Sequence, residues 1–198
     1  MSEQAETISV EESGRKKKHA RRVLIFCGIA LLNVGLLALL LTQLLTPAQQ
    51  TPADPLLGHV APGFSLATVD SAMGKRELSL ADFAGRPVVI NFWATWCDPC
   101  KEEMPLLETT WKKLQAEGKE VVFLGIDFQE SSSDVAPFLQ QYGITYPVLL
   151  DVNGSAANTY RIVSLPDTFF ISRQGKVVSK VLQQLTDQAL TKGLQVIL

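Results

Sequence analysis

The sequence predicts an α/β domain with a mixed central sheet, preceded by one membrane-spanning helix. Three observations lead to this prediction: an uncharged apolar run over residues 23–45, several short runs rich in β-branched and aromatic residues after residue 88, and amphipathic helical segments between those runs. A strand, a helix and a second strand in this order form a βαβ unit with parallel strands. Two turn-linked strand pairs add antiparallel neighbours, so the sheet is expected to be mixed.

The chain starts with a polar segment. Residues 1–22 carry six Lys or Arg against four Asp or Glu, and the basic residues cluster at 15–22. Residues 23–45 are long enough to cross a hydrocarbon layer of roughly 30 Å as a helix. A cleaved signal peptide is the alternative, but its apolar core is shorter and is followed by a small-residue cleavage site. The positive-inside rule then keeps a basic tail over 1–22 in the cytoplasm and sends the following chain across the membrane.

A proline-rich linker and one domain are predicted after the span. Residues 46–55 read TPAQQTPADP and have no apolar periodicity, which indicates an extended tether. Residues 56–198 are long enough for one domain with its own core. Residues 46–198 carry twelve basic against sixteen acidic residues, and no basic patch suggests a nucleic-acid partner.

The domain is expected to open with a β-hairpin. Phe64, Leu66 and Thr68 alternate with smaller residues, and after a turn a second short strand is predicted at 77–80. A short helical turn at 81–83 follows, and Gly85 ends it. The next apolar run, from Val88 through Phe92, is typical of a strand buried on both faces.

A long amphipathic helix is predicted next, with Pro99 in its first turn and apolar residues at helical spacing at Met104, Leu107, Trp111 and Leu114. The remaining predicted elements are a strand at 120–127, a helix from about 131 to 142 with Pro137 near its first turn, a strand at 146–150, a short helix at 153–160, a hairpin of 168–172 with 177–181, and a helix at 186–198.

Two cysteines stand where the buried strand leads into the long helix. Cys97 at the helix N-terminus faces free backbone N–H groups and the positive end of the helix dipole, which stabilise a thiolate and make it the expected nucleophile. Cys100 lies one turn further on the same side and is the expected resolving thiol. A zinc site would need two more ligands, and Cys27, His19 and His59 lack the spacing for it. A purely structural disulfide is the other alternative, but a bridge across one turn constrains little of the unfolded chain.

The segment VVINFWATWCDPCKEE, followed by Pro105, resembles the TlpA/ResA-like branch of the thioredoxin superfamily, whose members are membrane-anchored, extracytoplasmic thiol-disulfide oxidoreductases. Many of them serve cytochrome c maturation. The resemblance covers about Pro55 to the C-terminus. It implies a thioredoxin-like fold with a helical insertion and an enzyme that reduces protein disulfides. Apocytochrome c is the leading substrate that it implies, and because an extracytoplasmic compartment is oxidising, a membrane thiol carrier would have to supply electrons.

Glu103 follows Cys100 by three residues, which places its carboxylate on the same side of the helix. Its family counterpart is an active-site acid, and burial would raise its pKa so that it exchanges protons with Cys100. The alternative is a solvated glutamate on the helix surface. Asn91 departs from ordinary thioredoxin, which has a buried aspartate at this strand position. Because Asn91 cannot carry a proton, Glu103 gains importance.

The resemblance also implies a cis-proline at Pro166 beside the nucleophile, with the backbone of Leu165 free to pair with an extended substrate segment. A trans-proline turn is the alternative. Trp96 is expected to offer an apolar docking surface. Asp98 and Pro99 lie between the cysteines as tuning residues, and the Asp98 charge opposes thiolate formation, which favours a reducing couple.

Three other functions stay open: a disulfide oxidase, a thiol peroxidase, and a tethered binding or chaperone module that works without the thiols. The peroxiredoxin pattern Pro-x-x-x-Thr-x-x-Cys is absent, since Thr95 stands only two residues before Cys97. No Cys-x-x-Cys-His haem motif is present, and we expect neither a cofactor nor a metal.

Overall fold

The computed structural model describes residues 28–40, 42, 54–69 and 76–198, and the chain divides into two units, residues 1–53 and 54–198. In the first unit, residues 28–40 are helical and their side chains are exposed. No helix within the described residues is both long and apolar enough to cross a membrane. The expected basic tail at 1–22, both ends of the expected span at 23–45, and linker residues 46–53 lie outside the described residues.

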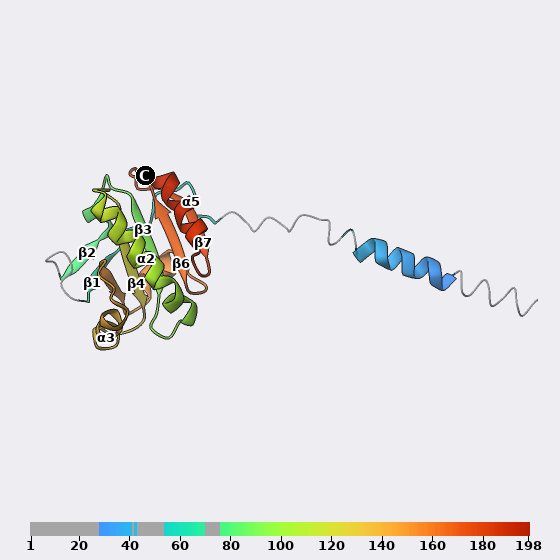
Figure 1. Cartoon of the computed structure of the whole chain (residues 1–198), viewed down its shortest axis with the longest axis horizontal. Coiled ribbons are helices and arrows are strands. Elements are labelled where there is room, and N and C mark those ends of the chain that lie inside the picture. Colours follow the sequence, from blue (N-terminus) through green and yellow to red (C-terminus); the bar gives the residue numbers. More distant parts are fainter. Residues whose placement is uncertain (1–27, 41, 43–53, 70–75) are drawn as a thin grey trace, which may run out of the picture. The chain divides into compact units, whose positions relative to one another are not determined.

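A seven-stranded mixed sheet forms the centre of the second unit (Figure 1). Its strands are β1 (Ser65–Thr68), β2 (Glu77–Ser79), β3 (Val88–Trp93), β4 (Val122–Phe128), β5 (Val148–Asp151), β6 (Asp167–Ile171) and β7 (Val177–Leu182). Their order is β2-β1-β5-β4-β3-β6-β7. The three central strands β5, β4 and β3 are parallel, and every other neighbouring pair is antiparallel, as predicted for a mixed sheet.

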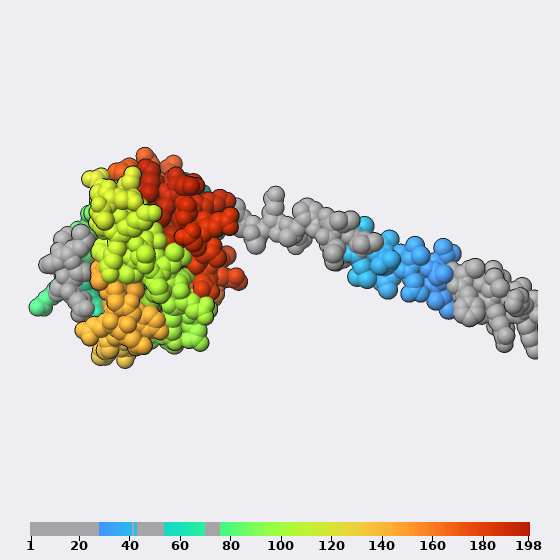
Figure 2. All heavy atoms as spheres, in the orientation of Figure 1, coloured from blue at the N-terminus to red at the C-terminus, as the bar shows by residue number. Residues whose placement is uncertain are grey.

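Helices cover both faces of this sheet. One face packs against α2 (Asp98–Ala116), α3 (Ser132–Tyr142) and α5 (Asp187–Ile197), and the other packs against the 3₁₀ turn η2 (Leu80–Phe83) and α4 (Ser155–Thr159). The space-filling view shows the first face, with α2 between the orange atoms of α3 and the red atoms of α5 (Figure 2). We call it the α2 face.

Strand β3 divides the core into two layers. All six of its residues are buried, as its sequence predicts. Because side chains alternate along a strand, Val89 and Trp93 pack under α2, while Ile90 and Phe92 pack on the opposite face. Asn91 shares the parity of Val89 and Trp93, so its polar side chain lies on the α2 face.

The predicted hairpin and insertion are both present. β1 and β2 pair antiparallel, with Leu66 opposite Leu78. The insertion between β4 and α4 contains α3 and also strand β5, which enters the sheet between β4 and β1. The inserted strand therefore attaches the N-terminal hairpin to the rest of the sheet.

Pro137 lies just beyond the first turn of its helix, near which it was predicted. A capping box between Ser131 and Asp134 starts α3 at Ser132, so Pro137 lies in the second turn. The cap decides the start because it satisfies the free N–H groups of the first turn, whereas proline only forgoes one hydrogen bond.

Candidate active site

Cys97 and Cys100 form a disulfide at the N-terminus of α2. Cys97 is the N-cap residue of this helix, and its Sγ accepts a hydrogen bond from the Cys100 N–H at 3.3 Å. Pro99 stands in the first turn, as predicted. Cys97 is 5% exposed and Cys100 is 0% exposed, so an attacking thiolate from solvent meets Cys97. This difference is what a reactive first cysteine and a shielded second one require.

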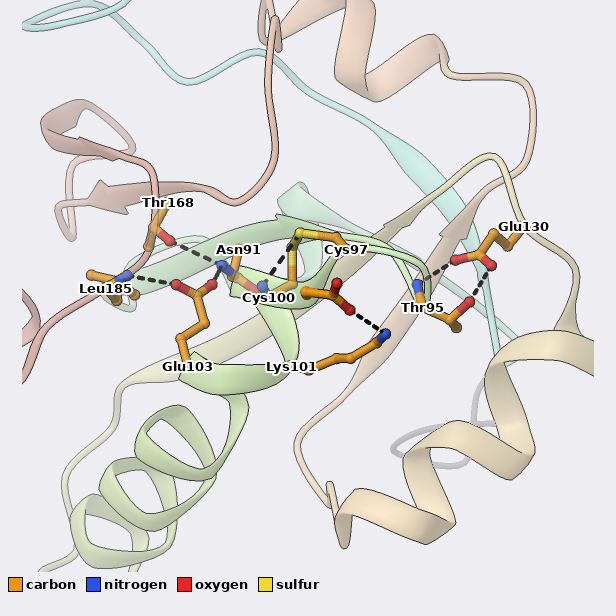
Figure 3. Close-up of a disulfide and its surroundings, with 10 residues drawn as sticks. Asn91, Thr95, Cys97, Cys100, Lys101, Glu103, Glu130, Thr168 and Leu185 are labelled. Atoms are coloured by element: carbon orange, nitrogen blue, oxygen red, sulfur yellow. Dashed lines mark hydrogen bonds and ion pairs between the residues drawn. A yellow bond between two sulfur atoms is a disulfide. The ribbon is translucent and has the colours of Figure 1, made fainter.

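Glu103 is buried beside the dithiol, and only 1% of it is exposed. Its Oε1 accepts a hydrogen bond from Asn91 Nδ2 at 2.7 Å, and its Oε2 accepts one from the Leu185 N–H at 2.6 Å (Figure 3). The Asn91 amide also donates to Thr168 Oγ1 at 3.0 Å. Burial raises the pKa of Glu103 to about 7, although the Leu185 and Asn91 hydrogen bonds oppose the rise.

The exposed rim of the site carries one ion pair. Asp98 lies 2.7 Å from the Lys101 ammonium, and this hydrogen bond keeps the pKa of Asp98 below its usual value. Lys101 therefore offsets part of the Asp98 charge, which was expected to act alone. Trp96 is 62% exposed, as a docking side chain needs to be, whereas Trp93 is fully buried and stacks on Phe138 of α3.

The Leu165–Pro166 peptide bond is cis, as the family resemblance implies. Pro166 is buried and precedes β6, whose first residue Asp167 pairs with Phe92 of β3. The Pro166 loop therefore lies at the sheet edge where β3 leads toward the dithiol. Within the described residues, the backbone of Leu165 makes no backbone hydrogen bond. It is available to an added strand.

A buried lysine supports β6 directly after Pro166. Lys180 Nζ lies 3.0 Å from Asp167 and 2.8 Å from Asp54, and 4.6 Å above the ring centroid of Phe169. Asp167 is completely buried, and desolvation raises its pKa to about 6 despite the lysine. This cluster was not predicted from the sequence, because the spacing of its members along the chain follows no motif.

Four further residues escaped the sequence analysis. Thr168 and Leu185 complete the hydrogen bonds around Asn91 and Glu103. Glu130 accepts a hydrogen bond from the Thr95 N–H at 2.6 Å, and Asp127 lies in register with Trp93. Of these residues only Asp127 gives a sequence signal, since it is an ionisable residue inside an apolar strand.

The chain is similar in sequence to known proteins over most of its length. A family model described as the AhpC/TSA family matches residues 57–180. The thiol-disulfide oxidoreductase ResA of Oceanobacillus iheyensis is 31% identical over 179 residues, which cover 90% of this chain and 91% of that protein. ResA of Bacillus subtilis is 33% identical over 173 residues, which cover 87% of this chain and 92% of that protein.

A solved structure shares the fold. The thiol:disulfide interchange protein of the thioredoxin family from Chlorobium tepidum is 28% identical and superposes with a TM-score of 0.60 over 70% of this chain and 94% of that one. The chain belongs to the AhpC/TSA family, with a thioredoxin-like fold, and is a thiol-disulfide oxidoreductase related to ResA.

Proposed function

We propose that the protein is a membrane-tethered, extracytoplasmic reductase of protein disulfides, with apocytochrome c as its leading substrate. The observation that carries the reductase proposal is the buried Glu103 carboxyl, held three residues after Cys100 on the same helix with its pKa raised to about 7. A group with this pKa can take up and release a proton near neutral pH, which a resolving thiol needs.

In the proposed cycle the reduced protein attacks first with Cys97. The Cys97 thiolate displaces one sulfur of the substrate disulfide, which leaves as a thiolate, and a mixed disulfide forms. Cys100 then gives its proton to Glu103 and attacks the Cys97 sulfur. This second step releases the other substrate thiolate and forms the Cys97–Cys100 disulfide. The substrate gains two electrons, and a membrane dithiol carrier returns two electrons to the protein.

The charge of Asp98 favours the reducing direction. Asp98 puts a negative charge next to Cys97, which opposes a strongly stabilised thiolate and so a strongly oxidising couple. Asn91 is neutral where a carboxylate would otherwise stand, which leaves Glu103 as the buried group that ionises near neutral pH beside Cys100. Lys101 weakens the Asp98 effect, so the expected couple is moderately reducing.

The substrate would dock at the rim of the disulfide. The exposed Trp96 indole offers an apolar surface, and the free backbone of Leu165 before cis-Pro166 can pair with an extended substrate segment. An apocytochrome with its haem-binding cysteines oxidised would present such a segment around its disulfide. Apocytochrome c is proposed as the substrate because of the family resemblance.

The membrane tether is proposed from the sequence of residues 23–45 and from the exposed apolar side chains within 28–40, including Leu31, Leu32 and Val34. The positive-inside rule sets the proposed orientation. A reporter enzyme that is active only outside the cytoplasm, fused to Leu198, tests this orientation. Reporter activity supports the orientation, and an inactive but stable fusion contradicts it.

The reduction potential of the Cys97–Cys100 couple tests the direction of electron flow. The full chain is equilibrated in dithiothreitol and glutathione buffers, and the fraction oxidised is read after thiol alkylation. A value close to about −270 mV supports a reductase, and a value close to about −120 mV shows a disulfide donor.

A second experiment separates the enzyme from a peroxidase or a binding module. Cys100→Ser is expected to accumulate a mixed disulfide with a peptide disulfide substrate, whereas Cys97→Ser forms none. Rapid consumption of peroxide by the wild type would favour the peroxidase. Full biological function of a variant with both cysteines replaced by serine would favour the binding module and reject the reductase.

A further inference from the structure

A β-turn joins the end of strand β3 to the nucleophilic cysteine. The chain leaves β3 at Trp93, and the Cys97 N–H donates a hydrogen bond to the Ala94 carbonyl oxygen at 3.2 Å, which closes the turn. Thr95 and Trp96 are its two central residues. The geometry of this turn therefore sets the positions of the Cys97 sulfur and of the exposed indole beside it.

Glu130 binds the first central residue of this turn through both of its carboxyl oxygens. Its Oε2 accepts the Thr95 N–H at 2.6 Å, its Oε1 accepts the Thr95 hydroxyl proton, and both side chains are partly buried (Figure 3). Within the described part of the chain the Thr95 N–H makes no backbone hydrogen bond, so Glu130 supplies its acceptor. Two hydrogen bonds from one residue to one carboxylate fix the orientation of that residue as well as its distance.

The backbone on both sides of Glu130 is itself held in place. Gln129 has a left-handed backbone conformation with φ of 62°, and its N–H donates to the Asp151 carbonyl oxygen at 3.1 Å. Ser131 is the N-cap residue of α3 and forms a capping box with Asp134. The Glu130 carboxylate therefore extends from a short, hydrogen-bonded connection between β4 and α3, as a group that positions another residue requires.

Helix α2 holds Cys97 from the other direction along the chain. The Cys97 carbonyl oxygen accepts the Lys101 N–H at 3.2 Å, and its Sγ accepts the Cys100 N–H at 3.3 Å. The helix thus fixes the chain that follows Cys97, and the Thr95–Glu130 pair fixes the turn that precedes it. Closing the disulfide requires the Cys97 sulfur to stay against Cys100, so a looser turn would slow the attack of Cys100 on a mixed disulfide.

A second pair with the same chemistry lies further along the chain. Glu108 Oε2 accepts the Thr145 N–H at 2.9 Å, and Glu108 Oε1 accepts the Thr145 hydroxyl proton. Glu108 also pairs with Lys112 at 2.8 Å. This pair joins α2 to the segment before β5, about two helical turns after Cys100. The two pairs differ in what they hold, and only the Thr95–Glu130 pair holds the turn that carries a reacting cysteine.

We propose that Glu130 is a positioning residue, which binds Thr95 and thereby keeps Cys97 in place for the attack by Cys100. The inference rests on the dithiol cycle of the proposed function, but it is independent of the natural substrate and of the direction of electron flow. Glu130 acts through Thr95 and not on a sulfur atom, so its role differs from that of Glu103, which exchanges a proton with Cys100.

The test compares Glu130→Ala with Glu130→Gln in the reduced full-length chain. Both variants lose the negative charge, but the glutamine oxygen can still accept the Thr95 N–H, and its amide can donate to the Thr95 hydroxyl. The protein is mixed with excess bis(2-hydroxyethyl) disulfide, an uncharged probe. Rapid quench and mass spectrometry then follow the conversion of the mixed disulfide at Cys97 into the Cys97–Cys100 disulfide. We expect this first-order step to be about tenfold slower in Glu130→Ala than in Glu130→Gln. Equal rates in the two variants overturn the proposal.

The Thr145–Glu108 pair supplies the matched control. Glu108→Ala and Glu108→Gln both lose the ion pair with Lys112, and only the alanine variant loses both hydrogen bonds to Thr145. These two variants should convert the mixed disulfide at the same rate. A tenfold difference between them as well would show a general loosening of the fold and would overturn the positioning role of Glu130.

Two further measurements keep the test decisive if Glu130→Ala folds poorly. Thr95→Ser keeps both donors to Glu130 and should convert the mixed disulfide as fast as the wild type, whereas Thr95→Val keeps only the N–H and should be slower. Hydrogen exchange followed by NMR should show a protected Thr95 amide in the reduced wild type, and rapid exchange of this amide overturns the proposal. A wild type that never converts the mixed disulfide would instead reject the dithiol cycle itself.

Discussion

Asn91 Nδ2 donates a hydrogen bond to Glu103 Oε1 at 2.7 Å and thereby links the central strand β3 to the active-site helix α2. The other Glu103 oxygen accepts the Leu185 N–H, so the ionised carboxylate has a donor at each oxygen. Burial still raises the pKa of Glu103 to about 7. Asn91 Oδ1 has no hydrogen-bond partner among the described residues, so turning the amide over would let this oxygen accept a hydrogen bond from the O–H of neutral Glu103. Asn91 can thus form a hydrogen bond with Glu103 whether that carboxyl group is ionised or neutral.

Glu103→Gln should slow the resolution of the mixed disulfide by Cys100. The glutamine cannot accept a proton, so general base catalysis is lost, and a decrease of about 100-fold is expected, with no inflection near pH 7. Rapid-quench measurement of mixed-disulfide decay from pH 5 to 9 checks this. The exposed Glu102→Gln variant is the control, and equal slowing in both variants would reject the role of Glu103.

The stability of the oxidised protein should fall between about pH 4.5 and 7. The pKa of Glu103 is about 7 in the folded protein and near 4.5 when unfolded, so the folded state binds more protons in this window and loses that advantage as the pH rises. The expected loss is about 3 kcal/mol of unfolding free energy. Urea unfolding at pH 4.5 and 8 measures the change in unfolding free energy for the wild type and for Glu103→Gln. Asp127 and Asp167 titrate in both proteins, so the change in the wild type minus the change in the variant gives the contribution of Glu103.

Asn91→Asp should raise the pKa of Glu103 well above 7. Two buried carboxyl groups in contact cannot both ionise, so they share one proton, and the unfolding free energy at pH 8 should drop by about 2 kcal/mol. Carbon-13 NMR titration of the Glu103 carboxyl checks the shift. An unchanged titration curve would mean that the Asn91 contact does not control Glu103.

Lys180→Met should destabilise the protein by about 3 kcal/mol, because it leaves the fully buried Asp167 without its cation. Chemical unfolding at pH 7 measures the loss. Adding Asp167→Asn to Lys180→Met should restore part of the stability, since the charge that needed a partner is gone. The exposed Lys176→Met is the control and should change the unfolding free energy little.

Gly193→Ala should destabilise the contact between α5 and the sheet. A Cβ at this position would overlap Cζ of Phe170 on β6, so the buried ring would have to move, at a cost of about 2 kcal/mol. Phe170→Leu in the same chain should relieve the clash. A double-mutant cycle from thermal unfolding measures this coupling, and additive effects would contradict the close approach.

Local patterns in the sequence already determine much of this protein. The buried strand β3, the helix that starts after Cys97, the spacing of Cys97, Cys100 and Glu103, and the N-terminal hairpin all follow from alternation, helical periodicity and turn residues. These features depend on neighbours within a few residues along the chain. The family resemblance added the cis-Pro166 loop, which spacing could not supply.

The tertiary structure decided what surrounds the dithiol. Thr168 is 77 residues from Asn91 and Leu185 is 82 residues from Glu103, so these contacts depend on the register of β6 and the packing of α5. The pairing of Glu130 with Thr95 likewise depends on β4 lying beside β3. A pKa depends on burial and on the donors that face the group, and both arise only when distant segments pack together. The sequence therefore predicts which two sulfur atoms react, and the packing of the fold determined the environment around them.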